Sequence, residues 1–365
     1  MPRKSDFGLE GRRTSNFFSK SNYVKGLSVF NKIVYALNLI FVSLLLIACA
    51  VPYLSVDFLP FLSFLSLAVP VLVAINFLFF LYWAFQGKRQ MLPSLFVLVF
   101  GYFVLGTFVK FNFSKQEFLK DDLKIMSYNI RSFNEFGWAE RKEVFNAIRD
   151  LVEEEQPDIV CFQEVSIGMK KQFLDYPYHY LKKIPTGDKV HLGIFSKYPI
   201  VNAETLTFPN SINNGSYADI AYQGDTVRLY NVHMQSLGIT PGTGVLRSRS
   251  SKFLYRKVVN AFKRQEQQAE MMARHRKASP YKTLLCGDFN NTQFSKEYHL
   301  LKGDMQDSFI EAGVGYGRTF NFLKIPLRID FIMADSSFEV KAHKNYNFKY
   351  SDHYPVMASF RLKKW

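Results

Sequence analysis

The sequence contains few cysteines, and three long stretches of it contain no charged side chain. Only three of its 365 residues are cysteines, which is too few to build a disulfide framework. Cys49 lies in one of the uncharged stretches, while Cys161 and Cys286 lie in apolar runs typical of strands. We interpret Cys161 and Cys286 as small core residues, so an oxidising compartment is allowed but not required.

The three uncharged stretches cover residues 33–54, 61–85 and 92–109. Each has about 18 residues or more without Asp, Glu, Lys or Arg, which is enough to cross a bilayer as a helix. A buried core helix could have the same composition, whereas a signal peptide would supply one such stretch near the start. We therefore predict three transmembrane helices within residues 31–112, with Asn38 and Asn76 hydrogen-bonding between them. Pro70 should kink the second helix, with neighbouring helices covering the carbonyl that it leaves free.

Basic residues predict how these helices are oriented. The N-terminal tail, residues 1–30, is basic, and the link between the second and third stretches carries Lys88 and Arg89. The link between the first two carries Asp57 and neither Lys nor Arg. Because basic links remain in the cytoplasm, three spans place the rest of the chain outside it. We predict a multi-pass integral protein of the cell (inner) membrane, with an extracytoplasmic domain over residues 121–365.

Positive charge is concentrated in one part of that domain. The formal net charge of the whole chain is +15. Residues 246–282 hold 11 Lys or Arg and only two Asp or Glu, whereas the rest of the domain is slightly acidic. Three interpretations remain open for this stretch. It follows a nucleic-acid backbone, it meets anionic lipid headgroups, or it is an ordinary amphipathic helix whose wet face is basic.

The domain alternates between strand and helix patterns. Apolar residues recur at helical spacing over residues 141–155, and Pro157 follows them. Gln223-Gly224-Asp225 separates two strand-like runs and predicts a hairpin. A long basic helix is predicted over residues 252–277, after a loop over residues 238–251. Further strands are predicted over residues 123–131, 159–165, 193–196, 284–290 and 328–333, with a last strand from residue 356.

Polar side chains end six of these apolar runs. They are Asn129, Glu164, His233, Asp288 with Asn290, Asp330, and Asp352 with His353. Core strands do not ordinarily end in unpaired acids or imidazoles, because a buried charge without a partner is costly. One such ending could be an Asx-rich turn or a buried core histidine, but six together indicate a site.

The residue types indicate the chemistry of that site. Carboxylates and carboxamides without cysteine suit a hard cation such as Mg²⁺ or Mn²⁺. Histidines beside acids suit general acid–base work. In Leu284–Asn290, period-two geometry directs Asp288 and Asn290 the same way if the strand continues, and Gly287 lets the backbone turn. Together these features predict metal-assisted hydrolysis of a phosphate ester.

The pattern resembles the endonuclease/exonuclease/phosphatase superfamily over residues 121–365, in the order and spacing of its motifs. The motifs are Ser127-Tyr128-Asn129-Ile130-Arg131, Phe162-Gln163-Glu164, Asn231-Val232-His233-Met234, Gly287-Asp288-Phe289-Asn290, Arg328-Ile329-Asp330-Phe331-Ile332 and Ser351-Asp352-His353. The resemblance implies a four-layer α/β sandwich, in which two mainly antiparallel sheets pack face to face with helices outside. The predicted membrane helices lie outside it.

The resemblance also implies a role for each polar strand end. Glu164 would be the principal metal ligand, with Asn129 and Asp352 close to the ion, which would be Mg²⁺ or Mn²⁺. Asp288 would position or deprotonate the attacking water.

The remaining residues would act on the phosphate. Asn290 and His233 would hold phosphate oxygens. Asp330 would orient His353, which would stabilise the transition state or serve the leaving oxygen.

Two residues argue against abasic-site DNA as the substrate. Abasic-site endonucleases carry an acid where this chain has Arg131 and a Tyr where it has His233, whereas deoxyribonuclease I-like members share the Asn-Ile-Arg of this chain. Three hypotheses remain. The first is a membrane-anchored nuclease or phosphodiesterase acting on nucleic acid. The second is a phosphatase or phospholipase-C-type enzyme acting on a lipid or small phosphoester. The third is a catalytically silent binding module. No protein partner is predicted.

Overall fold

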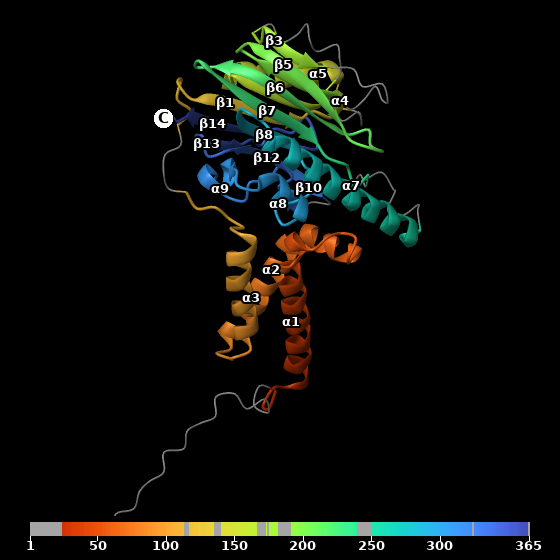
Figure 1. Ribbon diagram of the computed structural model, residues 1–365. Helices are drawn as coiled ribbons and strands as arrows, with labels where there is room; N and C mark the ends of the chain where they lie inside the picture. The colour runs from red at the N-terminus through yellow and green to blue at the C-terminus, as the bar shows by residue number, and fades with distance from the viewer. Residues whose placement is uncertain are drawn as a thin grey trace, which may run out of the picture.

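Two β-sheets form the head of the molecule, which stands on a stalk of three apolar helices in the computed structural model (Figure 1). The structure describes residues 24–112, 117–134, 140–165, 173, 175–181, 191–238, 250–322 and 325–363. Most of the basic tail and most of the loop predicted over residues 238–251 lie outside these ranges.

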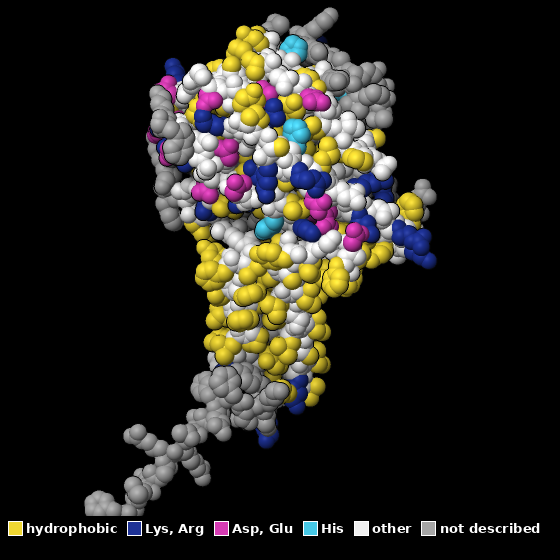
Figure 2. Space-filling view, viewed as in Figure 1, with side chains coloured by type: hydrophobic (Ala, Val, Ile, Leu, Met, Phe, Trp, Pro, Cys, Tyr) yellow, Lys and Arg dark blue, Asp and Glu magenta, His cyan; other side chains and the backbone are white. Residues whose placement is uncertain are grey.

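The stalk consists of α1 (Val29–Ala48), α2 (Phe64–Phe85) and α3 (Met91–Leu105), with short 3-10 turns η2 (Val51–Tyr53) and η3 (Pro60–Ser63) between α1 and α2. Hydrophobic side chains cover it in Figure 2, and basic side chains appear at both of its ends. The predicted hydrogen bonds are present: Asn38 Nδ2 donates to Ser94 Oγ at 2.6 Å, and Asn76 Nδ2 donates to Phe41 O at 3.1 Å.

Two of the three predicted spans reach the expected length. The segments Val29–Tyr53 and Pro60–Phe85 are long and apolar enough to cross a membrane. The third is shorter than predicted, because Gly106, with φ of 83°, ends α3 after 15 residues. A helix of that length is about 22 Å long, whereas the hydrocarbon core of a bilayer is about 30 Å thick.

The first sheet of the head has six strands and one parallel pair, β1 with β2. Its order is β13 (Phe338–Asn345), β14 (Val356–Leu362), β1 (Leu123–Asn129), β2 (Ile159–Val165), β4 (His191–Ser196) and β3 (Tyr178–Leu181). All other neighbouring strands in it are antiparallel.

The second sheet also has six strands and one parallel pair, β7 with β8. Its order is β5 (Ile200–Thr207), β6 (Asn214–Tyr222), β7 (Asp225–His233), β8 (Lys282–Asp288), β12 (Asp330–Ala334) and β9 (Gln306–Asp307). A separate ribbon pairs β10 (Phe320–Phe322) with β11 (Ile325–Leu327). The predicted hairpin joins β6 to β7.

Helices cover the outer faces of both sheets. They are α4 (Arg131–Asn134), α5 (Arg141–Glu155), α7 (Ser251–Lys277), α8 (Lys296–Lys302) and α9 (Ser308–Ala312). One apolar cluster packs the first sheet against α5, and another packs the second sheet against α7 and α8. This arrangement confirms the four-layer sandwich. It also confirms the predicted helices over residues 141–155 and 252–277.

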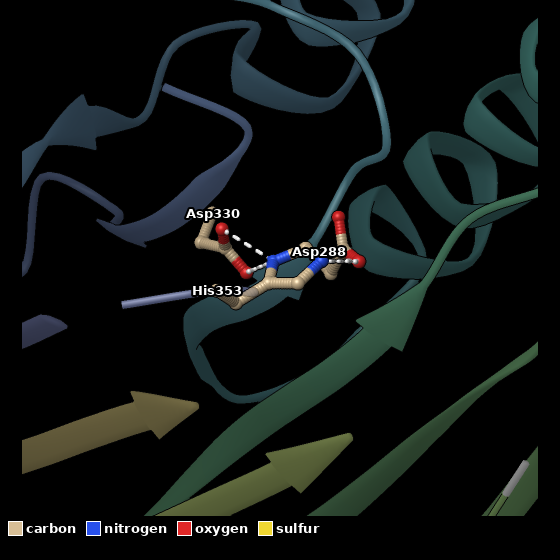
Figure 3. Close-up of side chains that lie close together, drawn as sticks. All are labelled: Asp288, Asp330 and His353. Carbon is tan, nitrogen blue, oxygen red and sulfur yellow. Dashed lines mark hydrogen bonds and ion pairs between the residues drawn. The ribbon is translucent and has the colours of Figure 1, made fainter. Parts of the chain in front are cut away.

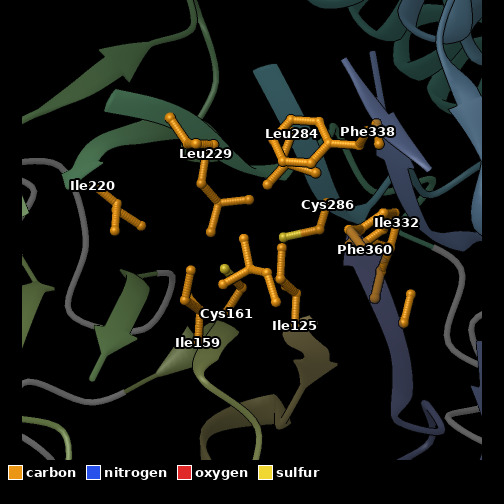
Figure 4. Packing of buried hydrophobic residues seen from close by; sticks show 14 of the residues in the cluster. Ile125, Ile159, Cys161, Ile220, Leu229, Leu284, Cys286, Ile332, Phe338 and Phe360 are labelled. Atoms are coloured by element: carbon orange, nitrogen blue, oxygen red, sulfur yellow. The ribbon is translucent and has the colours of Figure 1, made fainter. Parts of the chain in front are cut away.

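The central core lies between the two sheets (Figure 4). It contains aliphatic and aromatic side chains from both inner faces, and Cys161 and Cys286 are fully buried among them as free thiols. Burial raises the pKa of Cys161 well above its usual value, so the thiol stays protonated. Both cysteines are therefore the small core residues that the sequence predicted.

Gly287 is fixed by the close approach of β7 to β8. Its φ is 135°, and a Cβ atom there would lie 2.0 Å from the carbonyl oxygen of Val232 on β7. Only glycine allows this contact, which aligns the ends of the two parallel strands one residue before Asp288.

We predict that Gly287→Ala lowers the free energy of unfolding by more than about 3 kcal/mol, because the backbone of β7 or β8 must move. Gly224→Ala is the matched control. Gly224 also has positive φ, at 81°, but its Cβ would meet nothing within 4 Å, so about 1 kcal/mol is expected. Thermal unfolding of the whole chain in detergent measures both. Equal losses would contradict the steric argument.

Candidate active site

The polar strand ends meet at one end of the sandwich, where the two sheets face each other. The parallel pairing sets Asn129 beside Gln163 in the first sheet and His233 beside Asp288 in the second. Asn129 Nδ2 then donates across the gap to Asp288 Oδ2 at 3.0 Å. Strand pairing within each sheet and hydrogen bonding between sheets therefore build the site together.

Asp288 lies at the centre of the site and is fully buried. Its Oδ1 accepts from the backbone N of Asn290 at 2.8 Å, and its Oδ2 accepts from Asn290 Nδ2 at 3.2 Å. β8 ends at Asp288, and Asn290 has φ of 52°. The prediction that the strand continues to Asn290 is therefore wrong, because β8 ends two residues earlier. The two side chains meet because the backbone turns.

His353 lies between two carboxylates (Figure 3). Its Nδ1 is 3.0 Å from Asp330 Oδ2, and its Nε2 is 3.6 Å from Asp288 Oδ2. All three side chains are buried, and each offers a ligand atom within 4.8 Å of the others, close enough to hold a metal ion. Thr319 Oγ1, which the sequence did not single out, accepts from the backbone N of Asp330 at 3.1 Å and fixes the start of β12.

Glu164 is more open to solvent than the buried groups around it. Its side chain is 22% exposed, and its backbone has φ of 53°, which is unusual for a residue in a strand. Its Oε1 accepts from Asn129 Nδ2 at 3.3 Å and lies 3.7 Å from His233 Nε2. His233 Nε2 is also 3.6 Å from Asp288 Oδ2. Glu164 is therefore placed to meet a ligand that enters from solvent.

Asp352 is held at the edge of the site by an ion pair with Arg131. The neighbouring Ser351 Oγ donates to the carbonyl oxygen of Asn129 at 2.9 Å. Ser351 Oγ also lies 3.3 Å from Asp352 Oδ1, so Asp352 is linked to Asn129 through Ser351 and the structure connects all eight residues that the sequence singled out.

A buried pair of side-chain amides, Gln163 and Asn231, connects the two sheets next to the site. Gln163 Nε2 donates to Asn231 Oδ1 at 2.8 Å, and Asn231 Nδ2 donates to the carbonyl oxygen of Phe162 at 3.0 Å. Both side chains are fully buried between the sheets. Sequence reasoning missed their contact, although each belongs to a motif, because the sequence did not show that the two motifs face each other.

The two histidines of the site, His233 and His353, differ in their charge at pH 7. Burial lowers the pKa of His233 to about 4, so it is neutral at pH 7. Its Nδ1 has no hydrogen-bond partner among the described residues. Burial would also lower the pKa of His353, but Asp330 and Asp288 outweigh it and raise the pKa to about 9. The site thus pairs one neutral imidazole with one imidazolium.

The donor set fits a hard divalent cation. Its groups are oxygens and imidazole nitrogens, with no thiolate among them. Burial raises the pKa of Asp288, and the nearby Asp330 raises it further, although His353 acts in the opposite direction. A cation among these carboxylates would offset their mutual repulsion.

Two family models match the chain. Residues 126–353, more than half of the chain, match the model described as the Endonuclease/Exonuclease/phosphatase family. Residues 31–108, which form the stalk, match a domain of unknown function (DUF8431). No curated protein matches the sequence.

Solved structures with a similar fold come from several organisms. D. rerio TDP2 complexed with single strand DNA product is 15% identical with a TM-score of 0.50, covering 66% of this chain and 100% of that one. An endonuclease/exonuclease/phosphatase family protein from Bacteroides thetaiotaomicron is 20% identical with a TM-score of 0.51, covering 67% and 98%. The human Nocturnin catalytic domain with bound sulfate is 14% identical with a TM-score of 0.51, covering 67% and 96%. At such identities the likeness shows the fold alone.

We predict that Asp330→Asn lowers the pKa of His353 from about 9, because it removes the nearer of the two carboxylates that offset burial. The folded-state value lies above the unfolded value of about 6.5. Charged His353 therefore stabilises the fold fully below pH 6.5 or so, and this contribution is lost as the pH rises through about 9. NMR titration of the imidazoles in EDTA measures the shift. An unchanged His353 titration would contradict this assignment.

Proposed function

Because this chain belongs to the endonuclease/exonuclease/phosphatase family and is thus a phosphoester hydrolase, we propose that it is membrane-anchored and cleaves phosphodiester bonds in nucleic acid with a divalent cation. The observation that carries the proposal is the buried group of Asp288, Asp330 and His353, with Glu164 and His233 beside it. This set combines acids, a charged imidazole and a neutral imidazole in one place.

The cation that we propose is Mg²⁺ or Mn²⁺. Glu164 would hold it, with Asn129 and Asp352 nearby, because Glu164 is the acid with the most solvent access in the site. Arg131 would have to share or release Asp352 for that residue to take part. A bound cation would supply charge neutralisation at the phosphoryl oxygens.

We assign the proton chemistry to the buried residues. At pH 7 His353 carries a proton, since its pKa is about 9, and Asp330 fixes its orientation. Its Nε2–H can donate to a phosphoryl or leaving oxygen. His233 is neutral and can hold a phosphate oxygen through one N–H. Asp288 can accept a proton from water, because burial raises its pKa.

For Asn290 we propose a different role from the one that the resemblance implies. Its Nδ2 donates to the carbonyl oxygen of Met234 at 3.0 Å and lies 3.2 Å from Asp288 Oδ2. Both N–H groups are thus engaged within the protein. We propose that Asn290 chiefly holds Asp288 in position and contacts phosphate only if one of these bonds is released.

We propose that the stalk anchors the head in the cell (inner) membrane on its extracytoplasmic side. The link between α2 and α3, with Lys88 and Arg89, lies at the end of the stalk away from the head (Figure 1). The chain preceding α1, with Lys25, lies at that same end. The link between α1 and α2 lies against the head, and its Asp57 pairs with Lys263 at 2.6 Å. Basic links at the far end favour a cytoplasmic far end.

The basic helix α7 favours a polyanionic substrate. Its buried stripe packs against the second sheet, as an amphipathic helix requires, while Lys252, Arg256 and Lys257 are exposed. Cations arranged along one helix can follow a phosphate backbone. The D. rerio TDP2 structure holds a single strand DNA product, and this supports nucleic acid as the substrate class.

The test is hydrolysis by the purified whole chain in detergent with Mg²⁺ or Mn²⁺. The whole chain is needed because Phe294 of the head is buried in the apolar cluster of the stalk. Plasmid DNA, RNA, bis-(p-nitrophenyl) phosphate, p-nitrophenyl phosphate and phospholipid vesicles are compared. We expect plasmid nicking that EDTA abolishes. Lipid or monoester turnover without nicking would reject nucleic acid and favour the lipid or small-phosphoester hypothesis.

Substitutions at the two histidines test the site itself. We expect His233→Ala and His353→Ala each to lower turnover by about a hundredfold or more, the usual scale for a positioned acid–base group. His299→Ala is the matched control, because His299 lies on α8, outside the site, with its Nδ1 at 3.0 Å from a local carbonyl oxygen, that of Ser295. Wild-type turnover in both site variants would rule out this site.

Glu164→Gln separates metal binding from folding. It removes one ligand charge from a partly exposed side chain, so we expect weaker Mn²⁺ binding and lower activity with an unchanged thermal unfolding midpoint. Calorimetric titration with Mn²⁺ measures the binding. Unchanged affinity would show that another group holds the ion.

A further inference from the structure

The loop that follows Asp288 and Asn290 contacts the stalk. Asn291 and Thr292 are both buried, and Phe294 joins the apolar cluster of α1, α2 and α3. Ring contact with Phe108, at 5.4 Å between centroids, adds to that packing. The loop that directly follows two residues of the site is therefore also one of the segments that pack the head against the stalk.

Pro70 leaves one backbone carbonyl of α2 without its helical hydrogen-bond donor. Proline has no N–H, so the carbonyl four residues before it, that of Ser66, loses its helical partner. Ser66 is fully buried, and water cannot replace that partner. The sequence predicted that a neighbouring membrane helix would cover this carbonyl. In the structure a residue of the head does so instead.

Thr292 supplies the donor that this carbonyl lacks. Its Oγ1 donates to the carbonyl oxygen of Ser66 at 2.8 Å. A second contact runs beside it, with Ser66 Oγ at 3.1 Å from Asn291 Oδ1. The loop that begins at the site thus binds α2 through two consecutive residues, Thr292 at the carbonyl that Pro70 leaves free and Asn291 at the hydroxyl of the same residue, Ser66.

The same loop is held from its other side by α7. Gln265 Nε2 donates to the carbonyl oxygen of Asn290 at 3.2 Å, and Gln265 Oε1 accepts from Asn291 Nδ2 at 3.1 Å. Asn290 in turn donates to Asp288. A continuous path of hydrogen bonds and two peptide units therefore leads from the carbonyl of Ser66 to the carboxylate of Asp288.

We infer that Thr292 is a positioning residue, and that the Ser66 carbonyl, which Pro70 leaves without a helical donor, is its binding point on α2. By this contact the stalk holds the loop in the conformation in which Asn290 donates to Asp288 and keeps that carboxylate in the site. The stalk is then part of the structural support of the site as well as an anchor. This inference rests on the proposed function for its link to catalysis, but the contact itself can be tested without activity.

The hydroxyl and the proline offer a double-mutant cycle. Thr292→Val keeps the shape of the side chain and leaves the Ser66 carbonyl buried without a donor. Pro70→Ala restores a helical N–H to that carbonyl. We therefore expect Thr292→Val to destabilise the loop when Pro70 is present, and to destabilise it much less when it is combined with Pro70→Ala. Thr292→Ser, which retains a hydroxyl, should keep the loop as stable as in the wild type.

The first readout is hydrogen exchange of the loop in the whole chain, followed by mass spectrometry. We expect Thr292→Val to speed exchange of the amides in residues 289–295 by about tenfold, the factor for a loss of about 1.4 kcal/mol. Adding Pro70→Ala should return it toward wild type. Thr205→Val is the control. Thr205 lies on β5 and its hydroxyl is 2.9 Å from Tyr180 OH, so its loss should leave the exchange of the loop unchanged. Unchanged exchange in Thr292→Val overturns the inference.

The second readout is steady-state kinetics with bis-(p-nitrophenyl) phosphate. We expect Thr292→Val to lower kcat by about tenfold with little change in KM, since a small misplacement of reacting groups slows chemistry more than binding. A raised KM with unchanged kcat would reject the positioning role. If no variant, wild type included, hydrolyses any substrate while exchange behaves as expected, the proposed function fails and the structural coupling stands.

Discussion

The architecture of the head depends on burying charged groups at the end of a β-sandwich with a partner beside each of them. An isolated carboxylate or imidazolium in a protein interior is costly, and a network is tolerated only when its members satisfy one another. Asp288 achieves this through three N–H donors from Asn129 and Asn290. His353 achieves it by lying between Asp288 and Asp330. The close approach at Gly287 and the parallel strand pairs are what bring these donors and acceptors within reach.

The same rule governs the junction of head and stalk. Pro70 removes a donor from α2, and the buried carbonyl of Ser66 finds a replacement in Thr292, 226 positions along the chain. Glu266 of α7 behaves similarly, since its carboxylate accepts from the backbone N of Val56 at 2.8 Å and from Lys296 at 2.5 Å. These polar contacts require a defined orientation between the two parts. The family fold and the apolar helices therefore form one structural unit in this chain.

Sequence reasoning recovered the features that depend on local pattern. The helix over residues 141–155 follows from apolar periodicity, the β6–β7 hairpin from its turn residues, and the fold from matched motifs whose order identifies the family. It also singled out eight polar residues that the structure brings to one end of the sandwich, while their roles stay predictions. It did not recover features set by long-range contact or by a single backbone angle. Gly106 shortens α3, and the left-handed turn at Asn290 directs its amide into Asp288. Neither the Gln163–Asn231 pair nor the Thr292–Ser66 bond leaves a signal in a single sequence, because each joins segments that no local pattern relates.

The central claim is that these polar strand ends form a metal-dependent phosphoesterase site. The most direct measurement is anomalous scattering from Mn²⁺ in crystals of the whole chain. The account predicts a peak beside the Glu164 carboxylate, at about 2.1 Å from one of its oxygens, with Asn129 and Asp352 nearby. A peak elsewhere in the head, or none at saturating Mn²⁺, would contradict it.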